Sequence, residues 1–149
     1  MNAGTYYEHA ILDVIGSPRK DRQIIIPEYK LRINYDGDGI GRIDEVKTYK
    51  YEKGFTVSKD YWQQVQVQMF GKLWEEGKIP TSKIWAYGLL PEDYKNFFNP
   101  IDRERLKDYP IGYDEMFVGD YLRRNVYLCE CLNKGAMPSE KDYSMRQDC

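Results

Sequence analysis

The amino-acid sequence predicts an α/β (α+β) fold, with helices and strands combined in one domain of residues 1–149. Three observations support this prediction. Residues 31–47 alternate apolar and polar side chains around a glycine-rich turn, which is typical of a β-hairpin. Residues 58–77 and 114–133 repeat apolar side chains at helical spacing. Residues 83–90 form a short apolar run, which favours a buried strand.

The N-terminal segment is predicted to be a helix, because Tyr7, Ile11 and Ile15 lie at spacings that place them on one face. Thr5 and Glu8 have the spacing of a capping box, in which a hydroxyl and a carboxylate each accept a backbone N–H at a helix start. Capping is therefore one interpretation of Glu8. A place in a metal site is the other.

The predicted hairpin brings acidic and basic side chains together. Side chains alternate between the two faces of a strand, so the apolar members of residues 31–35 can be buried while Asp36 lies on the other face. On the second strand Glu45 and Lys47 point the same way. Asp36, Glu45 and Lys47 can therefore converge.

Such a trio suits phosphodiester hydrolysis. Two neighbouring carboxylates repel each other unless a cation lies between them, and hard oxygen ligands suit Mg²⁺ or Mn²⁺. A nearby ammonium can stabilise the negative charge that develops on a phosphate. The structural alternative is a surface hairpin, because Asp-Gly-Asp-Gly over residues 36–39 is also a good turn sequence.

Residues 58–77 are predicted to be a helix that begins at the N-cap Ser58 and ends at Gly77. A helical wheel places Gln66 inside the apolar face and Gln64 nearly opposite. A buried amide needs hydrogen-bond partners. Gln66 is thus expected either to bond a backbone group in the core or to line a polar active site.

Four segments, in this order, resemble the successive motifs of lambda-type alkaline exonucleases, which belong to the PD-(D/E)XK nuclease superfamily. They are Gly4-Thr5-Tyr6-Tyr7-Glu8, Tyr35-Asp36-Gly37, Glu45-Val46-Lys47 and Tyr61-Trp62-Gln63-Gln64-Val65-Gln66. The similarity extends from about residue 3 to residue 90. It implies a central mixed β-sheet flanked by helices with a restriction-endonuclease-like core, a divalent metal, and hydrolysis of DNA, usually from a duplex end.

The resemblance also implies roles for individual residues. The metal ligands that it implies for Mg²⁺ or Mn²⁺ are Asp36, Glu45, Val46 and Glu8. Lys47 would be the catalytic lysine and Gln64 the motif glutamine. The helical wheel favours Gln66 instead, so both glutamines are candidate site residues, and the motif makes Gln64 the preferred one.

The sequence departs from the family pattern at Tyr35, where the family has proline. An upstream Pro27-Glu28 makes Glu28 an alternative first acid, although its distance from Glu45 would demand a longer hairpin. Asp38 and Asp44 are interpreted as turn and surface residues, because Asp38 falls in the expected turn and Asp44 has the opposite parity to Glu45.

The net charge of −2 argues against broad coating of DNA but not against a nuclease with local basic clusters. The residues in the two clusters that are candidates for DNA binding are Arg19, Lys20, Arg22, Lys50 and Lys53. Lysines interleaved with tyrosines can bind phosphates and stack on bases. His9, the single histidine, can contact DNA or support the site, but it cannot build a histidine-rich metal centre.

The sequence therefore predicts a cytoplasmic, Mg²⁺- or Mn²⁺-dependent exonuclease acting on linear duplex or single-stranded DNA in phage-type recombination or repair. Homo-oligomers or a recombination partner protein are compatible with this prediction. No apolar run is long enough to span a membrane, so no membrane contact is expected. Three alternatives remain: a RecB-like or Cas4-like nuclease domain of a larger complex, an inactive nucleic-acid-binding remnant, and a virion or assembly protein. The chain can also be a truncated member of the group that carries iron–sulfur clusters, although no cysteine precedes Glu8.

Overall fold

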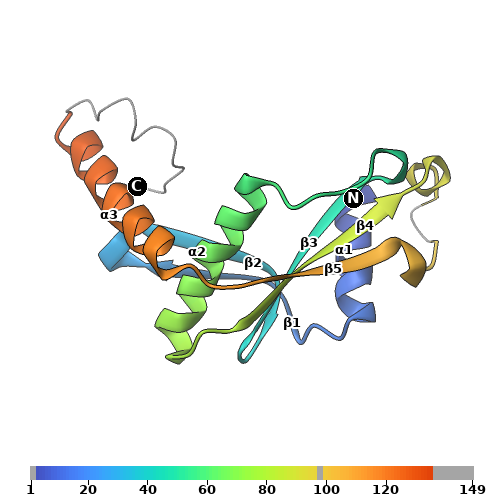
Figure 1. Cartoon of the computed structure of the whole chain (residues 1–149), viewed down its shortest axis with the longest axis horizontal. Coiled ribbons are helices and arrows are strands. Elements are labelled where there is room, and N and C mark those ends of the chain that lie inside the picture. The colour runs from blue at the N-terminus through green and yellow to red at the C-terminus, as the bar shows by residue number, and fades with distance from the viewer. Residues whose placement is uncertain (1–2, 97–98, 136–149) are drawn as a thin grey trace.

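The computed structural model describes residues 3–96 and 99–135 (Figure 1). In chain order, its main elements are α1 (Ala3–Val14), β1 (Arg19–Ile26), β2 (Leu31–Gly39), β3 (Arg42–Lys50), α2 (Lys59–Glu76), β4 (Thr81–Leu89), β5 (Leu106–Ile111) and α3 (Glu115–Asn133). The five strands form one sheet in the order β1-β2-β3-β4-β5. Pairing is antiparallel except between β3 and β4, which are parallel and connected through α2. The prediction of a mixed sheet with flanking helices is confirmed.

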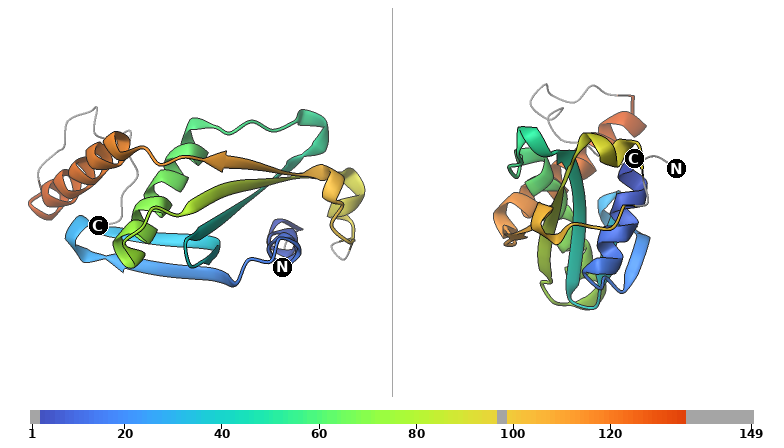
Figure 2. Two further views of the ribbon diagram at one scale, coloured as in Figure 1. Left: turned by 60° about the horizontal axis from the view of Figure 1, so that its bottom comes forward. Right: turned by 90° about the vertical axis from the view of Figure 1, so that its right-hand side faces the viewer.

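Helices cover both faces of the sheet (Figure 2). On one face, α1 contributes Tyr7 and Ile11 to a core cluster that also contains Val46 of β3. On the other face, Val65 of α2 packs in a cluster with Ile43 of β3. Because Ile43 and Val46 face opposite sides, β3 is covered by helices on both sides and becomes a central element of the fold.

The helix α2 begins and ends where the sequence predicts. The Ser58 hydroxyl accepts the backbone N–H of Tyr61 at 3.1 Å, which satisfies one of the free donors of the first turn. Gly77 ends the helix with a left-handed φ of 76°, a conformation that glycine adopts without a Cβ clash. The helix expected over 114–133 is likewise present as α3, capped by Asp114.

The β2–β3 hairpin is longer than expected, because its turn consists of Ile40 and Gly41 rather than the whole glycine-rich stretch. Gly41 has a left-handed φ of 70°. Asp38, which the sequence places in the turn, is therefore inside β2. That prediction is wrong because β2 continues through Gly37 and Gly39.

Two edge strands are not predicted by the sequence. β1 begins with a run of charged residues, which we interpreted only as a basic cluster. β5 has charged residues near its start and contains Pro110. Proline lacks the N–H that a central strand would need, and an edge strand tolerates it.

The sheet is distorted beside the candidate site. Asp21 of β1 has a left-handed φ of 53° and is skipped in the pairing of β1 with β2. On β2, Tyr35 and Asp38 are three residues apart, yet both bond to α2, through the Gln68 carbonyl and the Lys72 ammonium. Strict alternation would place them on opposite faces. The side-chain alternation of β2 therefore shifts between Tyr35 and Asp38, next to Asp36.

Candidate active site

The candidate active site lies where β2 and β3 separate. Ladder pairing between these strands ends at Gly37 and Asp44, so Asp36 and Glu45 are the first residues beyond it. The Asp36 carboxylate accepts the backbone N–H of Val46 at 2.9 Å. A side chain thus replaces a ladder hydrogen bond and holds Asp36 against β3.

Glu8 reaches the same place from α1. Burial, and then the Asp36 carboxylate, raise the pKa of Glu8 to about 7. Burial and the same Asp36 carboxylate raise the pKa of Glu45 well above its ordinary value. The Asp36 carboxylate therefore lies near both Glu8 of α1 and Glu45 of β3, although the three residues do not each bring one oxygen within 4.8 Å of the other two.

The capping interpretation of Glu8 is wrong. α1 begins at Ala3, so Thr5 lies within the helix and cannot be its N-cap. Glu8 lies three residues beyond Thr5, and its carboxylate lies near Asp36 of β2.

Glutamines of α2 hold the buried carboxylate of Glu45, which is 2% exposed. Its Oε2 accepts the side-chain amides of Gln64 at 3.0 Å and Gln68 at 2.5 Å. The Gln64 carbonyl oxygen in turn accepts a hydrogen bond from Lys47 at 3.0 Å. The Lys47 ammonium also lies 4.5 Å from the centre of the Tyr61 ring. Gln64 therefore bridges Glu45 and Lys47 and fixes both side chains.

Gln66 does not belong to this site. It is fully buried, and its amide bonds the carbonyl of Gly112 and the N–H of Asp114 at 2.7 Å each. It anchors the chain that leads into α3. The helical wheel correctly predicted its burial, whereas the motif pointed to Gln64 as the residue beside Glu45.

Gln68 was not singled out from the sequence. It follows Gln64 by four residues, which places the two amides on one face of a helix, and this spacing was the available signal. Its carbonyl oxygen is buried without a hydrogen-bond partner in the described residues.

Carboxylates are the residue type that suits a hard divalent cation, but in the described residues only Glu8, His9 and Asp21 bring their donor atoms within 4.8 Å of one another. In the part of the chain that the structure describes, Glu8, Asp36 and Glu45 form no ion pair. Three clustered carboxylates, one of them buried, are costly without positive charge. The side chain of Val46 packs beside Tyr7 on the other face, so any ligand from Val46 would be its backbone carbonyl.

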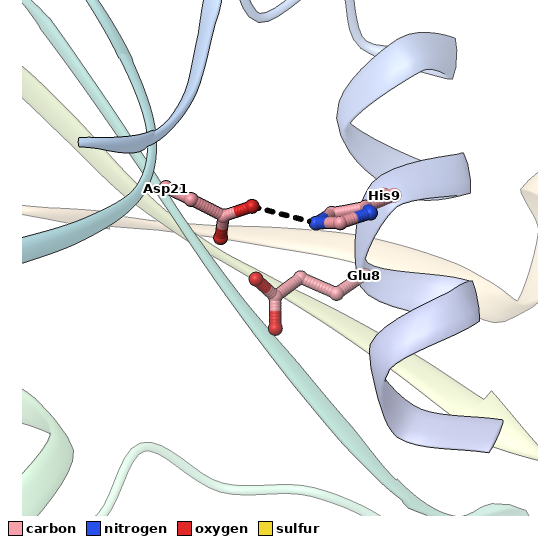
Figure 3. A group of neighbouring side chains, drawn as sticks. All are labelled: Glu8, His9 and Asp21. Atoms are coloured by element: carbon pink, nitrogen blue, oxygen red, sulfur yellow. Dashed lines mark hydrogen bonds and ion pairs between the residues drawn. The ribbon is translucent and has the colours of Figure 1, made fainter. Parts of the chain in front are cut away.

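A second group of potential ligands shares Glu8. Donor atoms of Glu8, His9 and Asp21 all lie within 4.8 Å of one another (Figure 3). His9 Nε2 is hydrogen-bonded to the Asp21 carboxylate at 2.8 Å, and both side chains are solvent-accessible. His9 therefore follows Glu8 directly in the sequence, and its ring bonds Asp21 at the solvent-accessible side of the site.

The other acids that the sequence offers as alternatives to Asp36 lie outside the candidate site. Glu28 is at the far end of the β1–β2 hairpin, where it accepts the indole N–H of Trp74 at 3.1 Å. Asp44 is buried and bonds Arg42 and Trp85, so its assignment to the surface is wrong.

Asp38 is also misassigned, since it is fully buried rather than exposed in a turn. It pairs with Arg19 at 2.6 Å, with Arg22 at 2.7 Å and with Lys72 at 3.0 Å. The shift in the alternation of β2 turns its side chain toward α2, which simple strand parity does not anticipate.

The basic residues predicted to bind DNA divide into two groups. Arg19 and Arg22 are bound to Asp38, and Lys20 pairs with Asp13. Their charge is balanced within the protein. Lys50 and Lys53 are exposed at the end of β3 and have no ion pair in residues 3–96 and 99–135.

This chain matches no known family model, and no curated protein or solved structure is significantly similar to it. Among the described helices, none has the length and apolar character needed to cross a membrane.

Proposed function

We propose that this protein is a divalent-metal-dependent DNA nuclease that hydrolyses phosphodiester bonds, most simply as an exonuclease on linear DNA. The observation that carries the proposal is the proximity of Asp36 to both Glu8 and Glu45, beside the Gln64–Lys47 bridge. The element order from α1 to β4 and the central mixed sheet are compatible with a PD-(D/E)XK core.

Glu8, Asp36 and Glu45, with the Val46 carbonyl, would hold Mg²⁺ or Mn²⁺. Such an ion activates a water molecule for attack and neutralises charge on the phosphate. Glu45 can use one oxygen for this purpose because its Oε2 is taken by two amides. The amides also prevent the side chain from rotating away.

Lys47 has the position expected of a charge stabiliser. Its ammonium is fixed by the Gln64 oxygen and the face of Tyr61, and it extends from the same strand face as Glu45. A positive charge held beside the phosphate gains strength as negative charge grows during attack by water. Lys47 bonds Gln64 and forms no ion pair with Glu45 in the described residues, so its ammonium would be available to the substrate.

The decisive experiment incubates the purified protein with end-labelled linear duplex, linear single strands and closed circular duplex. Each DNA is tested with Mg²⁺, with Mn²⁺ and with a chelator, and Asp36→Asn protein controls for contaminating nucleases. Metal-dependent loss of linear DNA alone supports an exonuclease, and cutting of circles indicates an endonuclease. Binding without cleavage of any DNA would refute the proposal and favour an inactive remnant.

A further inference from the structure

We propose that a surface of aromatic rings and lysines next to the candidate active site binds unpaired nucleotides of a single DNA strand. We call it the aromatic platform, and it comprises Lys47, Tyr49, Phe55, Tyr61, Lys107 and Tyr109. The inference rests on the proposed function, because it names the form of DNA that the site receives.

The sheet register places the two lysines of the platform in one row. Lys47 of β3 pairs with Ala86 of β4, and Ala86 pairs with Lys107 of β5. The adjacent row on the same face consists of Glu45, Ile84 and Tyr109. The platform thus starts at the candidate catalytic strand and crosses the sheet to the β5 edge.

The ring of Phe55 contacts the other three aromatic rings of the platform. Its ring centre lies 5.4 Å from that of Tyr49, 5.3 Å from that of Tyr109 and 6.0 Å from that of Tyr61, to which it is nearly parallel. All four side chains are half-buried, so part of each ring remains accessible. The segment from the end of β3 to α2, which carries Phe55, runs back alongside β5 (Figure 2, left).

An open hollow of about 510 Å³ continues the platform beyond Tyr109. Its wall is mostly apolar and includes Trp62, Pro110 and Val57, with Lys59 at the rim. The volume lies in the range of small-molecule sites. An indole and a phenol ring beside an ammonium suit a flat base that is linked to a phosphate.

The charge of this region favours an anionic occupant. Residues 47–62 contain four lysines and two acids, in a chain whose net charge is −2. On β5, Asp108 is paired with Lys83 on the other face of the sheet at 3.0 Å, while Lys107 has no ion pair in the described residues. An apolar peptide would gain nothing from these lysines. Bases can stack on rings only when they are not enclosed in a duplex, so the favoured occupant is a single strand.

The test measures binding of fluorescent oligo(dT) and of a matched duplex to the full chain in chelator, where no metal-dependent cleavage occurs. Wild-type protein should bind the single strand more tightly. Tyr109→Leu should weaken single-strand binding about tenfold. Tyr109→Phe, which keeps the ring, should bind like the wild type, and thermal melts establish that each variant is folded.

The lysines provide an independent measurement. Lys59→Gln and Lys107→Gln should each lower the slope of log affinity against log salt by about 0.7 for single strands. Lys78→Gln is the matched control, because Lys78 is an exposed lysine beyond the opposite end of α2 and should leave the slope unchanged.

Unchanged oligo(dT) binding by folded Tyr109→Leu and Lys107→Gln would overturn the platform, and so would tighter binding of the duplex. These results are separable from failure of the proposed function. Platform-dependent binding by a protein that cleaves nothing would refute the nuclease alone. Metal-dependent cleavage with no effect of the platform variants would refute the platform alone.

Discussion

Two buried carboxylates on neighbouring strands, Asp38 of β2 and Glu45 of β3, differ sharply in their surroundings. Their exposed fractions are 0% and 2%, and both face α2. Burial alone would raise the pKa of each. For Asp38, hydrogen bonds from Arg22 and Lys72 outweigh burial and lower the pKa. For Glu45, burial and the Asp36 carboxylate act together, and the pKa rises.

The surroundings of the two acids also differ in charge balance. The network around Asp38 contains three acids and three bases, namely Asp38, Glu75, Glu76, Arg19, Arg22 and Lys72. The candidate site contains three acids, Glu8, Asp36 and Glu45, and one base, Lys47. When ionised, the site has two excess negative charges, which one divalent cation would balance. Two equally buried acids thus have different surroundings: the network around Asp38 is balanced in charge, and the candidate site has an excess of negative charge, which is the reason for proposing that it binds a cation.

The largest expected effect is on cleavage. Asp36→Asn and Glu45→Gln should each abolish metal-dependent cleavage, because each removes a negative ligand without changing shape. Calorimetry should show weaker Mg²⁺ binding by both variants. Asp38→Asn should leave the turnover of its folded fraction unchanged.

Glu28→Gln is a further control, because Glu28 lies at the opposite end of β2 from Asp36. Loss of cleavage in Glu28→Gln with full activity in Asp36→Asn would show that the first acid is misassigned.

The next largest expected effect is on the free energy of unfolding. Removing the charge should destabilise the protein at Asp38 but not at Glu45. Asp38→Asn should lower the free energy of unfolding by about 3 kcal/mol, since it removes the buried negative charge that Lys72, Arg22 and Arg19 share. Glu45→Gln in metal-free protein should have little effect or stabilise, because the amide removes a charge that burial disfavours. Denaturant unfolding with chelator present measures both.

The effect of Asp38→Asn should also depend on pH. A lowered pKa in the folded state adds stability above the ordinary value of 3.8, and this stability is lost as pH falls through the lower folded value. The difference between wild type and Asp38→Asn should therefore shrink below about pH 3.8. A difference that stays constant into acid would mean that the carboxylate charge of Asp38 contributes little.

The main elements of the fold could be predicted from local patterns. Apolar spacing and the caps Ser58 and Gly77 defined α2, and alternation identified β2 and β3. The edge strands β1 and β5 could not be found in this way. An edge strand buries few side chains, so its sequence has a weak apolar pattern, and its position depends on pairing with distant residues.

The site was predicted in part, for a related reason. Parity on an ideal strand correctly grouped Glu45 with Lys47, but it misplaced Asp38 because β2 shifts its alternation beside Asp36. That shift depends on tertiary contacts with β1 and α2. A helical wheel showed that Gln66 is buried but not what it bonds, since its partners Gly112 and Asp114 lie far along the chain.

Lys47 should contribute more to turnover than to binding. Lys47→Ala should reduce single-turnover cleavage about 10²-fold, by analogy with loss of other preorganised charge stabilisers. DNA affinity should fall much less, because one phosphate contact among several is lost.

Lys50→Ala and Lys53→Ala serve as the contrast, because these lysines lie further along the same segment and are exposed. They should weaken binding in a salt-dependent way with turnover at saturation nearly unchanged. If Lys47→Ala behaves as they do, Lys47 only contributes to DNA binding at the end of a basic strand and has no catalytic role.

The smallest expected effect distinguishes Gln64 from Gln66, two residues apart on α2. Gln64→Ala should lower turnover about tenfold, because Glu45 and Lys47 lose the bridge that orients them, with little change in unfolding. Gln66→Ala should leave turnover of the folded protein near the wild-type value. It should lower the free energy of unfolding by about 2 kcal/mol, because the two hydrogen bonds that the buried Gln66 amide makes to Gly112 and Asp114 are lost. Cleavage rates and denaturant midpoints measured on the same preparations test both statements. The opposite pattern would transfer the site role to Gln66, and equally small effects in both variants would remove the bridge from the proposed mechanism.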